Sequence, residues 1–215
     1  MNQKKLLAVS IVTLIILADQ WIKIYIKLNY PLGMVKEFAD WAYLYFTENP
    51  GMAFGIEWGG DYGKLLLTLF RIAACIFGVW FVNQLIKKNE SSIYIASISL
   101  ILAGAIGNII DSVFYGVLFT ESTDFEIAQF SPGIGYAPLF YGKVVDMFYF
   151  PLFSGRFPDW LPIWGGEDFL FFRPIFNLAD ASITVGVALL MIFHKQINEY
   201  SEKLKNAQQE LSQSS

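Results

Sequence analysis

Four segments of the chain are apolar over the length that a helix needs to cross a lipid bilayer. They cover approximately residues 5–26, 65–86, 93–116 and 176–194, and about 20 helical residues span a bilayer core. Inside lipid every backbone polar group must be paired, so such segments fold as helices. With 55% of its 215 residues apolar and 16% charged, the chain is more apolar than soluble domains usually are. We therefore predict an all-α integral membrane protein with four transmembrane helices.

The first apolar segment also has features of a secretory signal peptide, because Lys4 and Lys5 precede a short apolar run. No small-x-small cleavage site follows it, and three further apolar segments come later. These features favour a first helix that stays in the membrane.

The orientation of the helices follows from basic residues near the ends of the apolar segments, since short cytoplasmic loops are enriched in Lys and Arg. Seven lysines fall on one side: Lys4, Lys5, Lys87, Lys88, Lys195, Lys203 and Lys205. We predict that this side is cytoplasmic, with both termini inside and two longer loops, about 27–64 and 117–175, outside.

The outer loops are rich in aromatic residues. The run Trp41–Phe46 alternates as a strand does and is followed by the turn residues Asn49, Pro50 and Gly51, which predicts a small outward-facing β-sheet subdomain. The second loop is expected to pack at the headgroup level. We assign residues 1–196 to the transmembrane domain and 197–215 to a polar cytoplasmic tail that is either a frayed helix or disordered.

Several kinds of site are excluded by residue counts. Cys75 and His194 are the only cysteine and the only histidine. This leaves no zinc site that needs two or more Cys or His ligands and no triad around any other histidine. We expect no metal and no cofactor. The net charge is −4, and no basic face for nucleic acid is present.

Ionisable residues inside the apolar segments are costly and need a reason. With both termini inside, all of them fall in the outer half of the membrane, at one depth with the outer-loop residues Asn49 and Asp146: they are Asp19, Lys23, Arg71, Asp111 and Asp180, with Asn108 nearby. The inner halves are almost entirely apolar, which indicates one site at the outer leaflet.

Each residue also has an ordinary structural interpretation. Asp19 and Lys23 can form an i, i+4 ion pair, and Asn177 and Asp180 fit the cap and third residue of the last helix. Asn108 and Asp111 could hydrogen-bond across the bundle.

The surrounding motifs favour a functional site. DQWIK at 19–23, NPGMAFG at 49–55, GNIID at 107–111, VVDMF at 144–148 and FNLAD at 176–180 resemble, in order and in topological position, the lipoprotein signal peptidases, also called type II signal peptidases. The resemblance covers nearly all of the chain except the tail and residues from about 117 to 141.

The resemblance implies a membrane-embedded aspartyl endopeptidase of the bacterial cytoplasmic (inner) membrane, acting as a monomer among membrane lipids. Its substrates would be diacylglyceryl-modified prolipoproteins, cut just before the lipidated cysteine. The motifs map the catalytic pair to Asp146 and Asp180. They map site-shaping roles to six further residues: Asp19, Lys23, Asn49, Asn108, Asp111 and Asn177.

Two features depart from the family pattern. The family commonly has an arginine after the GNIID block, where this chain has Ser112. We expect the guanidinium of Arg71 to supply the missing charge to Asp111, Asp146 or Asp180. The second departure is the insertion before VVDMF.

An aspartate pair can hydrolyse a peptide bond when one carboxylate is the general base and the other carries a proton. Asp180, in the first turn of a helix, is expected to hold the charge and Asp146 the proton. Two other kinds of function also use acidic residues in membrane helices. A proton relay or transporter needs polar groups through the whole membrane, and a magnesium-dependent lipid phosphotransferase would use Asp111, Asp146 and Asp180 as ligands.

Overall fold

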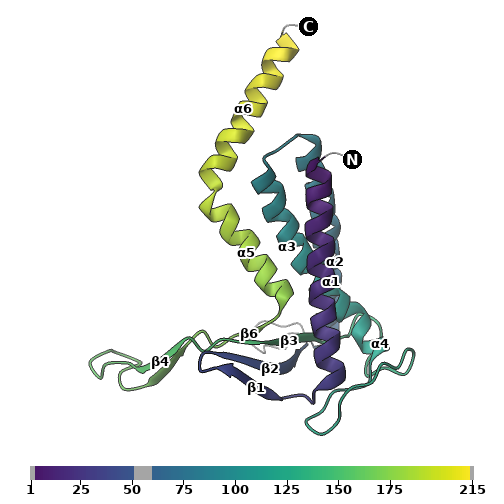
Figure 1. Ribbon diagram of the computed structural model, residues 1–215, viewed down its shortest axis with the longest axis vertical. Coiled ribbons are helices and arrows are strands. Elements are labelled where there is room, and N and C mark those ends of the chain that lie inside the picture. The colour runs from purple at the N-terminus through teal and green to yellow at the C-terminus, as the bar shows by residue number, and fades with distance from the viewer. Residues whose placement is uncertain (1–2, 51–59, 214–215) are drawn as a thin grey trace.

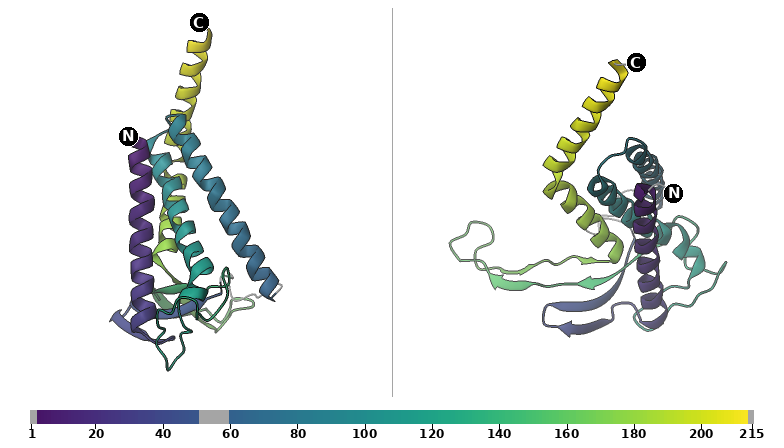
Figure 2. Two further views of the ribbon diagram at one scale, coloured as in Figure 1. Left: turned by 90° about the vertical axis from the view of Figure 1, so that its right-hand side faces the viewer. Right: turned by 45° about the horizontal axis from the view of Figure 1, so that its top comes forward.

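A computed structural model describes residues 3–50 and 60–213. Long helices lie side by side, and a small sheet lies across one end of them (Figure 1). The helices are α1 (Gln3–Asn29), α2 (Gly60–Lys87), α3 (Ser92–Ile110), the π-helical turn η2 (Asp111–Tyr115), α4 (Gly116–Leu118), α5 (Leu178–Ile192) and α6 (His194–Gln213). Both termini lie at the end of the helices away from the sheet (Figures 1 and 2). We call the two ends the sheet end and the terminal end.

The predicted sheet is present and antiparallel. Strands β1 (Val35–Ala39), β2 (Ala42–Asn49), β3 (Val144–Tyr149) and β6 (Ile175–Phe176) form it in the order β1-β2-β3-β6. Strands β4 (Phe153–Arg156) and β5 (Asp168–Phe171) form a separate two-stranded sheet. The alternating aromatic run falls in β2 as expected. The motif residues 51–55 lie outside the described residues.

The number of membrane spans in the described residues is three or four. In the described part of the chain, three helices are long and apolar enough to cross a membrane, and a fourth span exists only if α5 and α6 are taken together, although they are bent by 67° at their junction. Helix α5 has 15 residues, about 22 Å at 1.5 Å per residue, which is short of a bilayer core. The sequence turns polar at His194. The short apolar helix α5 therefore ends there, and the polar helix α6 begins. The tail is helical to Gln213 rather than disordered.

Glycines allow α3 and α5 to approach closely. A Cβ on Gly104 would lie 2.2 Å from the carbonyl oxygen of Ala179, and one on Gly186 would lie 2.7 Å from that of Ser97. Between helices in lipid there is little hydrophobic driving force, so association depends on close van der Waals packing, which small residues at the contact allow. The close contact brings the first turn of α5 against the last turns of α3.

The apolar core has two parts. One part, near the terminal end, joins α1, α2 and α3 through Ala8, Val82, Leu85, Ile95 and Leu102. The other, at the sheet end, joins α1 to the sheet and to the turn after α3, through Ile26, Phe46, Tyr115, Phe119, Val145 and Met147. Because Val145 and Met147 are fully buried in it, the backbone on both sides of Asp146 is fixed.

The segment 119–143, which contains most of the insertion expected at about 117–141, is tied to this second core by a buried ion pair. Lys27, at the end of α1, pairs with Glu48 on β2, and their side chains are 0% and 2% exposed. Ser122 of the insertion donates to Glu48 (2.9 Å) and accepts from Lys27 (2.9 Å). At its other end, the amide of Gly142 donates to the carbonyl of Ser112 over 2.8 Å. The insertion therefore holds together the end of α1, strand β2 and the turn after α3.

Candidate active site

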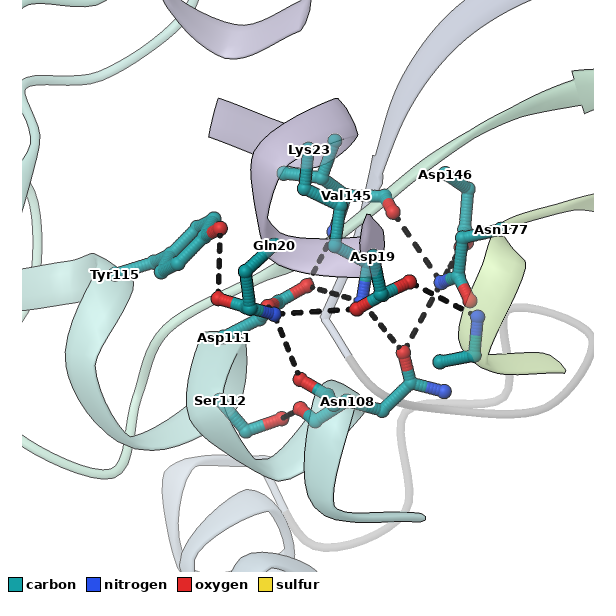
Figure 3. A network of polar contacts seen from close by, with 12 residues as sticks. Asp19, Gln20, Lys23, Asn108, Asp111, Ser112, Tyr115, Val145, Asp146 and Asn177 are labelled. Atoms are coloured by element: carbon teal, nitrogen blue, oxygen red, sulfur yellow. Dashed lines mark hydrogen bonds and ion pairs between the residues drawn. The ribbon is translucent and has the colours of Figure 1, made fainter. Parts of the chain in front are cut away.

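The polar residues of the motifs meet where α1, α3, β3 and α5 converge, at the sheet end of the helices (Figure 3). Asp19 and Lys23 come from α1, Asn108 from α3, Asp111 from the π-helical turn, Asp146 from β3, and Asn177 and Asp180 from the start of α5. Segments up to 160 residues apart in the chain are linked here, because the amide of Ala179 donates to Asp19 over 2.9 Å.

Lys23 is the centre of the α1 side. Its ammonium lies 2.9 Å from Asp19 and 2.8 Å from Asp111, and it donates to the side-chain oxygen of Asn108 over 2.8 Å. Lys23 is fully buried and so is Asp111. The i, i+4 ion pair with Asp19 is present, but the contact with Asp111 makes Lys23 a link between two helices. Removing one partner from a buried pair of this kind is strongly destabilising.

Asn177 joins the two aspartates to which catalysis was assigned. Its amide nitrogen donates to Asp146 (2.6 Å), to the carbonyl of Val145 (3.2 Å) and to Asn108 (3.0 Å). Its side-chain oxygen accepts from the amide of Asp180 over 2.9 Å, which completes a capping box at the start of α5. The predicted cap is therefore confirmed, and the same residue also contacts the carboxylate of Asp146.

Asp146 and Asp180 differ in environment. Asp146 is 4% exposed, whereas Asp180 is partly exposed and accepts from the amide of Asn108 over 2.8 Å. Burial, and then the nearby charge of Asp180, raise the pKa of Asp146 to about 7, against the opposing effects of Lys23 and of the hydrogen bond from Asn177. Near neutral pH Asp146 therefore carries a proton for a large part of the time.

The π-helical turn Asp111–Tyr115 interrupts α3 at the site, a position typical of such turns. It turns Asp111 toward β3, where one carboxylate oxygen accepts from the amide of Val145 over 3.2 Å. The other carboxylate oxygen accepts from the Gln20 amide over 2.9 Å. Together with the ion pair to Lys23, these hydrogen bonds hold the carboxylate of Asp111 in one place.

Two residues of this network were not among those predicted. Gln20 donates to Asp19 (3.2 Å), Asp111 and the carbonyl of Gly107 (3.1 Å), and accepts from the Tyr115 hydroxyl (3.1 Å). Gln20 lies inside the DQWIK block, and Tyr115 lies one helical turn after Asp111. The sequence signal for Gln20 was a polar residue within an apolar segment, and the signal for Tyr115 was its position one helical turn after Asp111.

Arg71, Asn49 and Ser112 have less central positions. Arg71, on α2, is close enough to Asp180 for their charges to interact. Asn49 is the last residue of β2 and is paired in register with Val144. Ser112 is 2% exposed and donates to the carbonyl of Asn108 over 3.0 Å. Among the described residues, no group of three or more His, Cys, Asp or Glu side chains is placed to hold a metal ion.

Fold and site together define a multi-pass membrane protein with a buried carboxylate, amide and lysine network at one end of its helices. The family model described as signal peptidase (SPase) II matches residues 11–195. The chain belongs to the signal peptidase II family, and it is a peptidase.

Curated relatives agree with this assignment. The lipoprotein signal peptidase of Porphyromonas gingivalis (strain W83) is 51% identical over 185 residues, which is 85% of this chain and 80% of the relative. That of Amoebophilus asiaticus (strain 5a2) is 41% identical over 187 residues, 85% of this chain and 75% of the relative. A solved bacterial membrane enzyme with 23% identity superposes with a TM-score of 0.55, covering 88% of this chain and 87% of that one, and supports the fold.

Proposed function

We propose that the protein removes the signal peptide from diacylglyceryl-modified bacterial prolipoproteins, cutting before the lipidated cysteine, with Asp146 and Asp180 as the catalytic pair. The observation that carries this proposal is the bridge made by Asn177, which contacts the carboxylate of Asp146 and caps the helix turn that holds Asp180. One rigid amide thus sets the position of both carboxylates. The relatives' names, which describe them as lipoprotein signal peptidases, support the substrate.

The two aspartates have different roles in the reaction. Asp180, partly exposed and in the first turn of a helix, acts as the general base and takes a proton from water as the water oxygen bonds to the scissile carbonyl carbon. Asp146, with a pKa of about 7, donates a hydrogen bond to the carbonyl oxygen. When the C–N bond breaks, the proton that Asp180 took from water passes to the leaving amine nitrogen, and Asp180 is again a carboxylate. One proton shared by the pair is sufficient for the cycle.

The remaining network positions the pair. Asn108 contacts Asp180, Asn177 and Lys23, so it joins the catalytic side to the Lys23 side. Asp19 and Asp111 fix Lys23, and Asp19 also holds the first turn of α5 through the amide of Ala179. Asn49 ends β2 and is paired in register with Val144, two residues before Asp146. Arg71 supplies positive charge near Asp180. It takes the role of the arginine that the family commonly has at the position of Ser112.

In the orientation that we propose, the sheet end lies at the outer leaflet of the inner membrane. More lysines lie near helix ends at the terminal end, among them Lys4, Lys88 and Lys195, than at the sheet end, where Lys27 and Lys64 lie, and this favours cytoplasmic termini. Helices α5 and the start of α6 then complete a fourth span, residues 1–196 form the peptidase domain, and residues 197–215 are a cytoplasmic tail. The protein acts as a monomer. Acyl chains of the substrate lie on apolar helix faces, at the depth of the two aspartates.

Cleavage of a diacylglyceryl-modified prolipoprotein by the purified full-length protein tests this function. Asp146→Asn and Asp180→Asn are each expected to lower the turnover number by several orders of magnitude. Asp40→Asn, which changes an exposed carboxylate in the turn before β2, is the matched control and is expected to cleave normally. Activity should persist in the presence of a chelator. Substantial turnover by either catalytic variant would remove that residue from the pair.

A further inference from the structure

A hairpin of aromatic residues is inserted in the chain between the two catalytic aspartates. It runs from Leu152 to Phe172, contains β4 and β5, and is called the aromatic hairpin here. It begins three residues after β3, which carries Asp146, and ends three residues before β6, which leads into the cap of α5. Figure 1 shows it projecting sideways from the sheet, at the sheet end and on the side of α5.

The two faces of the hairpin differ in chemistry. Residues directly opposite each other in an antiparallel pair lie on the same face. One face therefore carries Phe153 opposite Phe171 and Gly155 opposite Phe169, whereas the other carries Arg156 opposite Asp168. The first face is aromatic and the second is partly charged.

The aromatic face is a continuous row of rings. The rings of Phe153 and Phe171 are stacked with centroids 4.7 Å apart, and Phe169 lies 6.2 Å from Phe153 and 4.7 Å from Phe157. A Cβ on Gly155 would come within 2.8 Å of the Phe169 ring, so the ring covers the glycine. These contacts give the hairpin a defined shape of its own.

The row of rings is left largely uncovered. Phe153 is 54% exposed and Phe171 is 50% exposed, and at the tip Trp160 and Ile163 are 78% and 85% exposed. A two-stranded hairpin is at best marginally stable in water. Its aromatic face therefore needs a surface to cover it.

We propose that the aromatic hairpin is an interfacial anchor, whose aromatic face lies in the headgroup region of the leaflet at the sheet end and sets the depth of the catalytic strand relative to the membrane. Helices that cross the membrane define its normal, and the hairpin projects across that direction at the level where the helices end (Figures 1 and 2). Trp rings favour this level, and Trp160 and Trp164 lie in the loop between β4 and β5.

Two adjacent positions test the anchor without any measurement of activity. In full-length protein with Cys75→Ala, spin labels are attached at Phe153→Cys or at Ser154→Cys, which point to opposite faces of β4. After reconstitution in vesicles of phosphatidylethanolamine and phosphatidylglycerol, the label at 153 is expected to be accessible to oxygen and shielded from a water-soluble nickel chelate. The label at 154 is expected to show the reverse.

Other labelling outcomes overturn the anchor. Equal exposure of both labels to the nickel chelate would mean that the hairpin stands in water. Shielding of the 153 label from both reagents would mean that protein covers the aromatic face, and oxygen access at both positions would mean that the hairpin is immersed rather than lying flat. Circular dichroism and thermal unfolding of each labelled protein check that it is folded.

The effect on catalysis rests on the proposed function and is measured separately. Replacing Trp160, Ile163 and Trp164 together with Ser removes apolar area from the interface. It is expected to lower kcat/KM for vesicle-embedded prolipoprotein by roughly tenfold or more, because less apolar surface then holds the protein at the interface, and to leave cleavage in detergent nearly unchanged. Asp159→Asn in the same loop is the control. Equal losses in vesicles and detergent would overturn the depth-setting role, and inactive wild-type protein would instead count against the proposed function.

Discussion

Replacing Asn177 by Asp separates the two tasks of this residue. A carboxylate can still accept from the amide of Asp180 and so keep the helix cap, but it cannot donate to Asp146 as the Asn177 amide does over 2.6 Å. It also adds a negative charge beside Asp146. The variant therefore changes the electrostatics of the pair while it keeps the helix cap, although it also loses the bonds from Asn177 to Asn108 and to the carbonyl of Val145.

The expected size of the effect follows from the lost hydrogen bond. A hydrogen bond to a charged group contributes about 1.5–3 kcal/mol, and one pKa unit corresponds to about 1.4 kcal/mol. Loss of this bond alone should raise the pKa of Asp146 from about 7 by roughly one to two units. The added charge acts in the same direction, because it disfavours a second ionised carboxylate.

The assay is the pH dependence of kcat/KM for prolipoprotein cleavage. In the wild-type protein activity should fall as pH rises through about 7, where Asp146 loses its proton. In Asn177→Asp this fall should move to higher pH, with a lower maximal rate. Asn177→Ala, which removes both the cap and the donor, should unfold at a clearly lower temperature in detergent, since loss of a cap costs about 1 kcal/mol. If the fall of kcat/KM at high pH is unchanged in Asn177→Asp, or if both variants are equally destabilised on heating, capping of α5 and donation to Asp146 are not separable tasks of Asn177.

Further predictions concern the residues around the pair. Asp146→Asn should unfold at a higher temperature than the wild type above pH 7. The folded-state pKa of Asp146 is raised, so the contribution of this carboxyl to the unfolding free energy is lost as pH rises toward about 7, whereas an amide has no such loss. Equal unfolding temperatures at pH 8 would contradict this reasoning. Lys23→Met should lower the unfolding free energy by about 3–5 kcal/mol because Asp19 and Asp111 lose their buried partner, as measured by denaturant unfolding in mixed micelles, and a loss below 1 kcal/mol would mean that water replaces the ammonium. Arg71→Gln should lower kcat/KM for prolipoprotein cleavage because a cation near Asp180 is lost, and Ser112→Arg in that background should partly restore it; an unchanged kcat/KM in Arg71→Gln would contradict a role of this charge. Tyr115→Phe should cost about 1 kcal/mol of stability through its single hydrogen bond to Gln20, and unchanged thermal unfolding would show that the bond contributes nothing.

The sequence was most informative where the membrane restricts the possibilities. Each ionisable residue in an apolar segment needs a partner, so Asp19, Lys23 and Asp111 could be predicted to share one site, and the structure places them in contact. The capping role of Asn177 followed from local spacing. Its contact with Asp146 did not, because that contact depends on the register of β3 against the start of α5, which is a tertiary property.

Other features had no local signal. The π-helical turn at Asp111 differs from an α-helix by one residue and leaves the apolar pattern unchanged. The bend between α5 and α6 was missed because the apolar segment is nearly long enough for a span, and the polar residues after His194 continue the helix in a new direction. The burial of Lys27 with Glu48 was also missed, because Lys27 lies just beyond the apolar segment, where a lysine can normally extend to water.

The charge balance of the site gives a physical reason why one aspartate of the proposed catalytic pair is neutral. Asp19 and Asp111 share the ammonium of Lys23, so two carboxylates face one cation on this side. The Asp146 and Asp180 pair adds two further carboxylates, and the positive charge of Arg71 interacts with Asp180. Among the described residues, the cation that acts on Asp146 is Lys23, which Asp19 and Asp111 also contact, and Asp146 is 4% exposed. Keeping a proton on Asp146 is therefore the least costly state of this network, and that proton is the one that the proposed mechanism uses.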